Sequence, residues 1–105
     1  PQYFGTAIDA LEKVSRLAPT DAKTFYLLGR FLEAASQNET AIKNYLHAIE
    51  LKSNYDYASF SLGQLYFQNK NYSEAKKYFE LTLNYAPTNL DAQNYLDKIE
   101  KLLVK

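Results

Sequence analysis

The side chains that could carry out catalysis are few and scattered in this sequence. His47 is the only histidine, and cysteine is absent. Neither a glycine-rich phosphate loop, nor a nucleophile elbow, nor a His-Glu metal spacing occurs. Carboxylate neighbours such as Glu33 and Glu39, or Asp97 and Glu100, have the spacing of surface and capping charges on helices. We therefore predict a chain that is not an enzyme and has no cofactor and no metal site, with His47 as a solvated surface side chain.

These residues are positioned by a pattern that recurs every 34 residues. A leucine-glycine pair, an apolar residue, an alanine and an aromatic residue follow one another at the same distances in each copy, and a repeat of this length is typical of helical solenoids. The N-terminus holds an incomplete copy. The matching positions are Leu28-Gly29, Leu32, Ala41, Tyr45 and Ser53 in the first complete copy, Leu62-Gly63, Tyr66, Ala75, Phe79 and Pro87 in the next, and Ala7, Leu11 and Pro19 in the incomplete one.

Apolar residues three and four positions apart predict six helices and no strand. Pro19 ends the first helix, and Thr20 or Asp21 is the expected N-cap of the second. The Ser36-x-x-Glu39 sequence has the spacing of a capping box for the third helix. The short turns make consecutive helices antiparallel neighbours. The expected helices span about 3–17, 22–35, 40–51, 56–69, 71–85 and 90–104.

Two glycines, Gly29 and Gly63, fall inside expected helices, where glycine costs about 1 kcal/mol relative to alanine. Small residues at a helix contact let two antiparallel helices approach closely. We therefore predict that both glycines lie at a close contact between the two helices of a hairpin, with Ala41 and Ala75 opening the facing helices.

The repeat resembles the tetratricopeptide repeat (TPR) family, whose pattern is an aromatic residue, Leu-Gly and Tyr on a first helix, then Ala, Phe, Ala and a closing Pro on a second. This chain departs from the pattern at Leu32, Ser53, Ser59 and Thr82. The resemblance covers practically the whole chain and implies an all-α fold, a right-handed α-solenoid of antiparallel helix hairpins. It implies a single array with residues 1–21 as the second helix of a truncated repeat, 22–55 and 56–89 as full repeats, and 90–105 as a C-terminal capping helix.

In this family the inner face of the first helices lines a concave groove that holds a peptide. The resemblance therefore implies a protein or peptide partner, with Arg30 and Lys98 engaging carboxylates and Gln64 and Asn94 hydrogen-bonding an extended backbone. The aromatic residues supply rigid apolar area. The groove positions are Lys23, Tyr26, Arg30, Glu33, Tyr57, Phe60, Ser61, Gln64, Phe67, Gln68, Asn94, Tyr95, Lys98 and Lys101.

Two observations limit this groove. For Phe60, Phe67 and Tyr95 the alternative is that they only fill space between adjacent helices. Members of the family that clamp chaperone C-terminal carboxylates carry lysine, asparagine and arginine at fixed groove positions, and those residues are missing here, so we do not expect chaperone-tail recognition. The clamp positions are held in this chain by Tyr26, Arg30, Ser61, Asp91 and Tyr95.

The composition sets the remaining limits. The formal net charge is zero, so nothing predicts nucleic-acid binding. No apolar run approaches the roughly 20 residues of a membrane-spanning helix, so we expect no direct membrane insertion by this segment. Methionine is absent, which indicates a processed product or a segment of a longer protein. We favour a cytoplasmic protein, or a soluble domain of a membrane-attached parent.

Three functions agree with the sequence. The leading prediction is a non-catalytic protein-interaction module that binds a peptide or a partner helix in the groove. The second is the soluble TPR tail of a bacterial membrane or cell-envelope enzyme, of the glycan ligase or glycosyltransferase type, that positions a substrate or partner. The third is a self-associating scaffold, a homo-oligomer formed through the N-terminal face, because no capping helix precedes Phe4 and Ile8.

Overall fold

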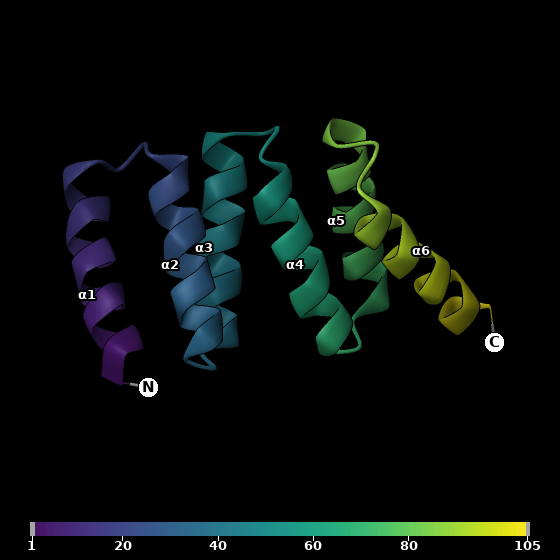
Figure 1. The fold of residues 1–105 in the computed structure, drawn as a ribbon, viewed down its shortest axis with the longest axis horizontal. Helices are drawn as coiled ribbons and strands as arrows, with labels where there is room; N and C mark the ends of the chain where they lie inside the picture. The colour runs from purple at the N-terminus through teal and green to yellow at the C-terminus, as the bar shows by residue number, and fades with distance from the viewer. Residues whose placement is uncertain (1, 105) are drawn as a thin grey trace. The chain divides into compact units, whose positions relative to one another are not determined.

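The computed structural model describes the backbone of residues 2–104 and the side chains of residues 4–104. Within that part the regular structure consists of six α-helices without a strand (Figure 1). The predicted all-α helical repeat fold is confirmed, and each predicted helix end lies within two residues of the observed one. The helices are α1 (Gln2–Leu17), α2 (Ala22–Ala34), α3 (Asn38–Leu51), α4 (Asp56–Gln68), α5 (Tyr72–Tyr85) and α6 (Leu90–Leu103).

The chain divides into two compact units, Pro1–Ser53 and Asn54–Lys105. In the first unit α2 packs against both α1 and α3, and in the second α5 packs against both α4 and α6. Each unit thus contains one complete hairpin, α2–α3 or α4–α5, and one additional helix. The predicted repeats, 22–55 and 56–89, place their boundary two residues after this division.

An aromatic ring of the second helix lies directly on a glycine of the first helix in both hairpins. A Cβ atom added to Gly29 would lie 2.5 Å from Cε1 of Tyr45, and one added to Gly63 would lie 2.7 Å from Cε1 of Phe79. Both rings are fully buried. The predicted close contact is therefore confirmed, and its reason is that only glycine leaves room for the ring.

The two hairpins differ at one pair of core positions. In α4–α5, Ser59 Oγ and Thr82 Oγ1 form a buried hydrogen bond of 2.8 Å. In α2–α3 the position of Ser59 is held by Phe25, whose ring lies edge-on to His47 at 4.3 Å. His47 is therefore only partly solvated, with a side chain that is 43% exposed and an Nδ1 atom 3.3 Å from Oε1 of Glu50. This contact corrects the prediction of a freely solvated histidine.

Helices α2 and α4 end in the same left-handed turn. The equivalent residues Ser36 and Lys70 have φ angles of 62° and 63°. After α2 the N–H of Ser36 donates to the carbonyl of Glu33, and the N–H of Gln37 donates to the carbonyl of Leu32, at 2.9 and 2.8 Å. The turn after α4 has the same two bonds. This Schellman motif satisfies the last carbonyls of each helix, although the left-handed conformation costs a residue with a side chain roughly 1 kcal/mol.

The N-cap of α2 was predicted correctly, and that of α3 was not. Asp21 caps α2, because its carboxylate accepts hydrogen bonds from the N–H of Lys23 at 3.2 Å and from Oγ1 of Thr24 at 2.9 Å. The capping box at Ser36 is wrong, since Ser36 belongs to the left-handed turn and the N-cap of α3 is Gln37, without a side-chain bond.

The N-terminal helix leaves a different face open from the one predicted. Ile8 is buried, and the ring of Phe4 packs 6.4 Å from that of Phe31 on α2. The exposed apolar side chains of α1 are instead Val14, which is 41% exposed, and Leu17, which is 86% exposed. The open face therefore lies toward the C-terminal half of α1.

Candidate functional site

A pocket between α4 and α6 gathers part of the predicted groove within the second unit. Phe60 and Gln64 line it from α4, and Asn94, Tyr95 and Lys98 line it from α6. Each set stands three or four residues apart, so each lies on one face of its helix. The volume of the pocket is about 330 Å³.

Tyr95 forms the aromatic floor of this pocket. Its ring stacks on Phe79 with centroids 4.6 Å apart and an interplanar angle of 5°. The rings of Phe60 and Phe67 lie edge-on to it at 6.1 and 5.1 Å. These contacts hold Tyr95 from several sides, so the floor is rigid before any ligand arrives.

Polar groups surround the aromatic floor. Nε2 of Gln64 lies 3.4 Å from the hydroxyl of Tyr95, to which it donates, and Nζ of Lys98 lies 5.6 Å from the centre of the Tyr95 ring. Asn94 and Asp91 are exposed. The pocket thus offers two amides, one ammonium group and one carboxylate, which can bind backbone donors and acceptors and charged groups of either sign.

Asp91 was not among the predicted groove residues, although it lines the same pocket. Its place in the first turn of α6 made it look like a charge at a helix end. The signal that identifies it is its spacing, because Asp91 precedes Asn94 by three residues and Tyr95 by four and so shares their face.

In the first unit, the predicted groove residues are engaged with one another. Nη1 of Arg30 donates a 2.9 Å hydrogen bond to the hydroxyl of Tyr26, and the Tyr45 hydroxyl donates a 2.8 Å bond to Oε1 of Glu33. The hydrogen bond with Tyr26, together with their electrostatic interaction, raises the pKa of Arg30 above its ordinary value. Lys23 is exposed. Tyr26 therefore orients the guanidinium group of Arg30 along the surface of α2.

The remaining predicted residues lie outside the α4–α6 pocket. Phe67 packs between the rings of Tyr72 and Tyr95, as the space-filling alternative expects. Ser61 is buried. Tyr57, Gln68 and Lys101 are exposed but do not line the pocket. The structure thus brings together Phe60, Gln64, Asn94, Tyr95 and Lys98, and their role in binding stays a prediction.

Neither a metal-binding cluster nor a membrane-spanning helix is found in the described part of the chain. Among the described side chains, no group of three or more His, Cys, Asp or Glu residues is arranged to hold a metal ion. No helix within residues 2–104 has the length and apolar character that crossing a membrane requires.

The 34-residue period, the helical hairpins and the ring placed on a glycine in each of them define a tetratricopeptide repeat protein. Residues 32–105 match the family model described as "Regulator of microtubule dynamics protein 1-3". The chain belongs to this family.

Curated relatives share the repeat but are much longer. The chain is 33% identical over 82 residues to human "Tetratricopeptide repeat protein 6", covering 78% of this chain and 15% of that protein. It is 26% identical over 105 residues to mouse "Protein O-mannosyl-transferase TMTC1", covering 96% and 11%. It is 33% identical over 86 residues to the Giardia intestinalis "UDP-N-acetylglucosamine--peptide N-acetylglucosaminyltransferase", covering 82% and 6%. These relatives are eukaryotic, and the predicted bacterial source is not confirmed.

Solved structures resemble the whole chain. "First TPR of Spaghetti (RPAP3) bound to HSP90 peptide SRMEEVD" matches with a TM-score of 0.92 and 25% identity, over 99% of this chain and 82% of that one. "Crystal structure of MamA" matches with a TM-score of 0.89 and 26% identity, over 93% and 57%. The first of these is a complex with a peptide.

Proposed function

We propose that this chain is a non-catalytic protein-interaction module that binds a peptide or a partner helix on its first helices. The observation that carries the proposal is the α4–α6 pocket, where exposed amides and charges surround a rigid aromatic floor. The peptide complex of the similar RPAP3 domain supports the same class of ligand. The ligand is therefore a polypeptide segment.

The pocket suggests how such a segment is held. Asp91 and Lys98 are seven residues apart on α6, which separates them by about 10 Å along the helix axis. An extended peptide spans that distance with about three residues. We therefore expect a ligand with a basic group near Asp91 and an acidic group near Lys98, while the amides of Gln64 and Asn94 bind the backbone between them.

Peptide selection tests this proposal and requires no identified partner. Peptides from a displayed random library are enriched on the immobilised chain, synthesised, and measured with the purified protein by fluorescence anisotropy. The variant Gln64→Ala with Lys98→Glu is expected to bind them about tenfold more weakly, because it removes one hydrogen bond and reverses one charge.

The matched control is Gln93→Ala with Lys77→Glu, which makes the same changes outside the pocket. It is expected to leave the dissociation constant unchanged, and circular dichroism checks that both variants remain helical. If the pocket variant binds every selected peptide as tightly as the wild type does, the α4–α6 pocket is not the binding site.

The family description supplies a defined partner to test. Because it names microtubule dynamics, co-sedimentation with polymerised tubulin is the first assay with an identified protein. Binding that is lost in the Gln64→Ala, Lys98→Glu variant would assign the partner to the pocket. Absence of co-sedimentation removes microtubules as a direct ligand and leaves the peptide proposal to the library experiment.

A second candidate function rests on the relatives. Two of them carry transferase names, O-mannosyl-transferase and peptide N-acetylglucosaminyltransferase. In a protein of that kind the repeat would position a protein substrate near a catalytic domain. The coding sequence on both sides of this chain decides between the candidates, since a transferase domain there supports positioning, and further repeats or an unrelated domain count against it.

A further inference from the structure

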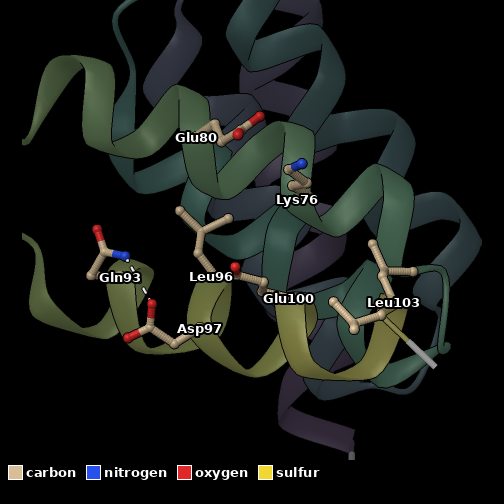
Figure 2. A pocket seen from close by; sticks show the side chains of 8 residues that line it. Lys76, Glu80, Gln93, Leu96, Asp97, Glu100 and Leu103 are labelled. Carbon is tan, nitrogen blue, oxygen red and sulfur yellow. Dashed lines mark hydrogen bonds between the residues drawn. The ribbon is translucent and has the colours of Figure 1, made fainter.

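A second concave surface lies between α5 and α6. It is a groove of about 430 Å³, lined by Lys76 and Glu80 from α5 and by Leu96, Asp97 and Glu100 from α6, among others (Figure 2). Figure 2 shows the Leu96 side chain directed from α6 toward α5. The α4–α6 pocket uses other residues of α6, so the two surfaces are distinct.

The α6 wall of this groove occupies the positions with which a first helix holds its second helix. Gly63 of α4 contacts Phe79 of α5, and the neighbouring Leu62 is fully buried. Thirty-four residues later, Leu96 stands at the position of Leu62 but is only half-buried, and Leu103 is 49% exposed. Helix α6 thus presents the face of a first helix that no second helix covers within residues 4–104.

The charges around the groove are unbalanced. Glu80, Asp97 and Glu100 bring three carboxylates to it, against the single ammonium group of Lys76. In the part of the chain that the structure describes, none of these carboxylates forms an ion pair. Asp97 accepts one hydrogen bond of 3.1 Å from Nε2 of Gln93, drawn as the dashed line in Figure 2. The groove therefore attracts cations.

Asp97 excludes another hairpin of the kind found in this chain. The rings of Tyr45 and Phe79 fill the space where a Cβ of the facing glycine would stand, and Asp97 has a side chain at the equivalent position. A second copy of the chain does not fit either, because the stripe Ala7 and Leu11 on α1 brings no cation to the carboxylate. An unpaired carboxylate at a buried contact is unfavourable.

We propose that the α5–α6 groove binds a basic amphipathic helix of a partner protein. A helix fits because α4 holds one with the equivalent face. Its apolar stripe covers Leu96 and Leu103, and lysine or arginine residues beside the stripe pair with Asp97 and Glu100. This proposal does not depend on peptide binding at the α4–α6 pocket.

The probe for the test is a synthetic amphipathic helical peptide with leucines on one face and lysines beside them, measured with the whole chain by fluorescence anisotropy. The charge reversal Asp97→Lys with Glu100→Lys is expected to weaken binding about five- to tenfold. The variant Leu103→Ser is expected to weaken it severalfold by removing apolar contact. Binding to the wild type is expected to fall as salt is raised, because salt screens exposed charges.

The matched control is Asp9→Lys with Glu12→Lys, which makes the same charge change at the same spacing on the exposed side of α1. It is expected to keep the wild-type dissociation constant. Equal loss in both double variants, or no loss in either, overturns the proposal, because the peptide would then respond only to total charge. Equal binding of a scrambled peptide of the same composition also overturns it. A wild-type dimer that Asp97→Lys dissociates would assign the groove to a second copy instead.

Discussion

The hydroxyl of Tyr45 donates a 2.8 Å hydrogen bond to Oε1 of Glu33, and thus joins α3 to α2 beside the Gly29 contact. In the other hairpin the equivalent residues are Phe79 and Phe67, and Phe67 packs against the cluster that contains Phe79. The same junction is polar in one copy and apolar in the other. The two partners therefore depend on each other within each copy.

The Tyr45–Glu33 bond gives the first prediction. Tyr45→Phe is expected to lower the free energy of unfolding by about 0.5–1.5 kcal/mol, since it removes one half-buried hydrogen bond and keeps the ring. Urea denaturation measures the change. In a Glu33→Ala background the same substitution is expected to cost much less, and an equal cost in both backgrounds would show that the bond contributes nothing.

The glycine contact gives the second prediction. Gly63→Ala is expected to destabilise the chain by about 1–3 kcal/mol, because the new Cβ collides with the Phe79 ring. Gly5 is the control, since it lies in α1 with no atom within 4 Å of its Cβ position. Gly5→Ala is expected to stabilise the helix by up to about 1 kcal/mol. Thermal unfolding that gives both substitutions the same sign would contradict the contact.

The left-handed turns give the third prediction. Ser36→Gly and Lys70→Gly are each expected to raise the free energy of unfolding by about 0.5–1 kcal/mol, because glycine adopts a positive φ without strain. Ser53→Gly is the control at a turn residue without positive φ. It is expected to be neutral or destabilising, and a gain there equal to the other two would remove the explanation.

Stacking of Tyr66 on Tyr78 gives a prediction about alkaline pH. The rings are 5.7 Å apart at 14°, and burial, followed by nearby negative charge, raises the pKa of both hydroxyls above 10.0. The folded chain therefore holds these protons more tightly than the unfolded chain. Their contribution to stability is complete below pH 10 and is lost as the pH rises through the folded-state pKa.

Denaturation at neutral pH and again above about pH 10 measures this loss. The variant Tyr66→Phe with Tyr78→Phe is expected to lose less stability between the two conditions than the wild type. Tyr57→Phe, at a side chain that is 66% exposed, is expected to behave as the wild type. A wild-type curve that the double substitution leaves unchanged would refute the assignment.

The open face of α1 gives the last prediction. Val14 is 41% exposed, whereas Ala48 and Thr82, its equivalents in α3 and α5, are fully buried. We propose self-association through Val14 and Leu17, because it would remove this apolar surface from water. Light scattering over a wide concentration range is expected to show dimers that Val14→Lys dissociates, and a constant monomer mass would remove the proposal.

The sequence was sufficient for the helices because the apolar period and the breakers repeat, so each copy supports the other. It was sufficient for the Gly29 and Gly63 contacts because glycine inside a helix requires a reason. It was not sufficient for the left-handed Ser36, since a serine before Glu39 satisfies the capping-box pattern whatever its φ angle.

The candidate site was harder to predict than the fold. Register placed Phe60, Phe67 and Tyr95 on the first helices, but only the packing decides which ring lines the pocket and which fills the interior. Glu33 illustrates the same limit, because its carboxylate binds Tyr45 on the facing helix. Such partners depend on side-chain rotamers across a helix contact, and helical periodicity contains no information about them.

The ring in each hairpin follows its glycine by 16 residues, and this constant offset has a consequence for how the chain can change length. Any in-frame duplication of 34 consecutive residues keeps every aromatic ring 16 residues after a glycine, wherever the duplicated stretch begins. A longer protein with one more closed hairpin therefore arises in a single genetic event, without compensating substitutions at either position.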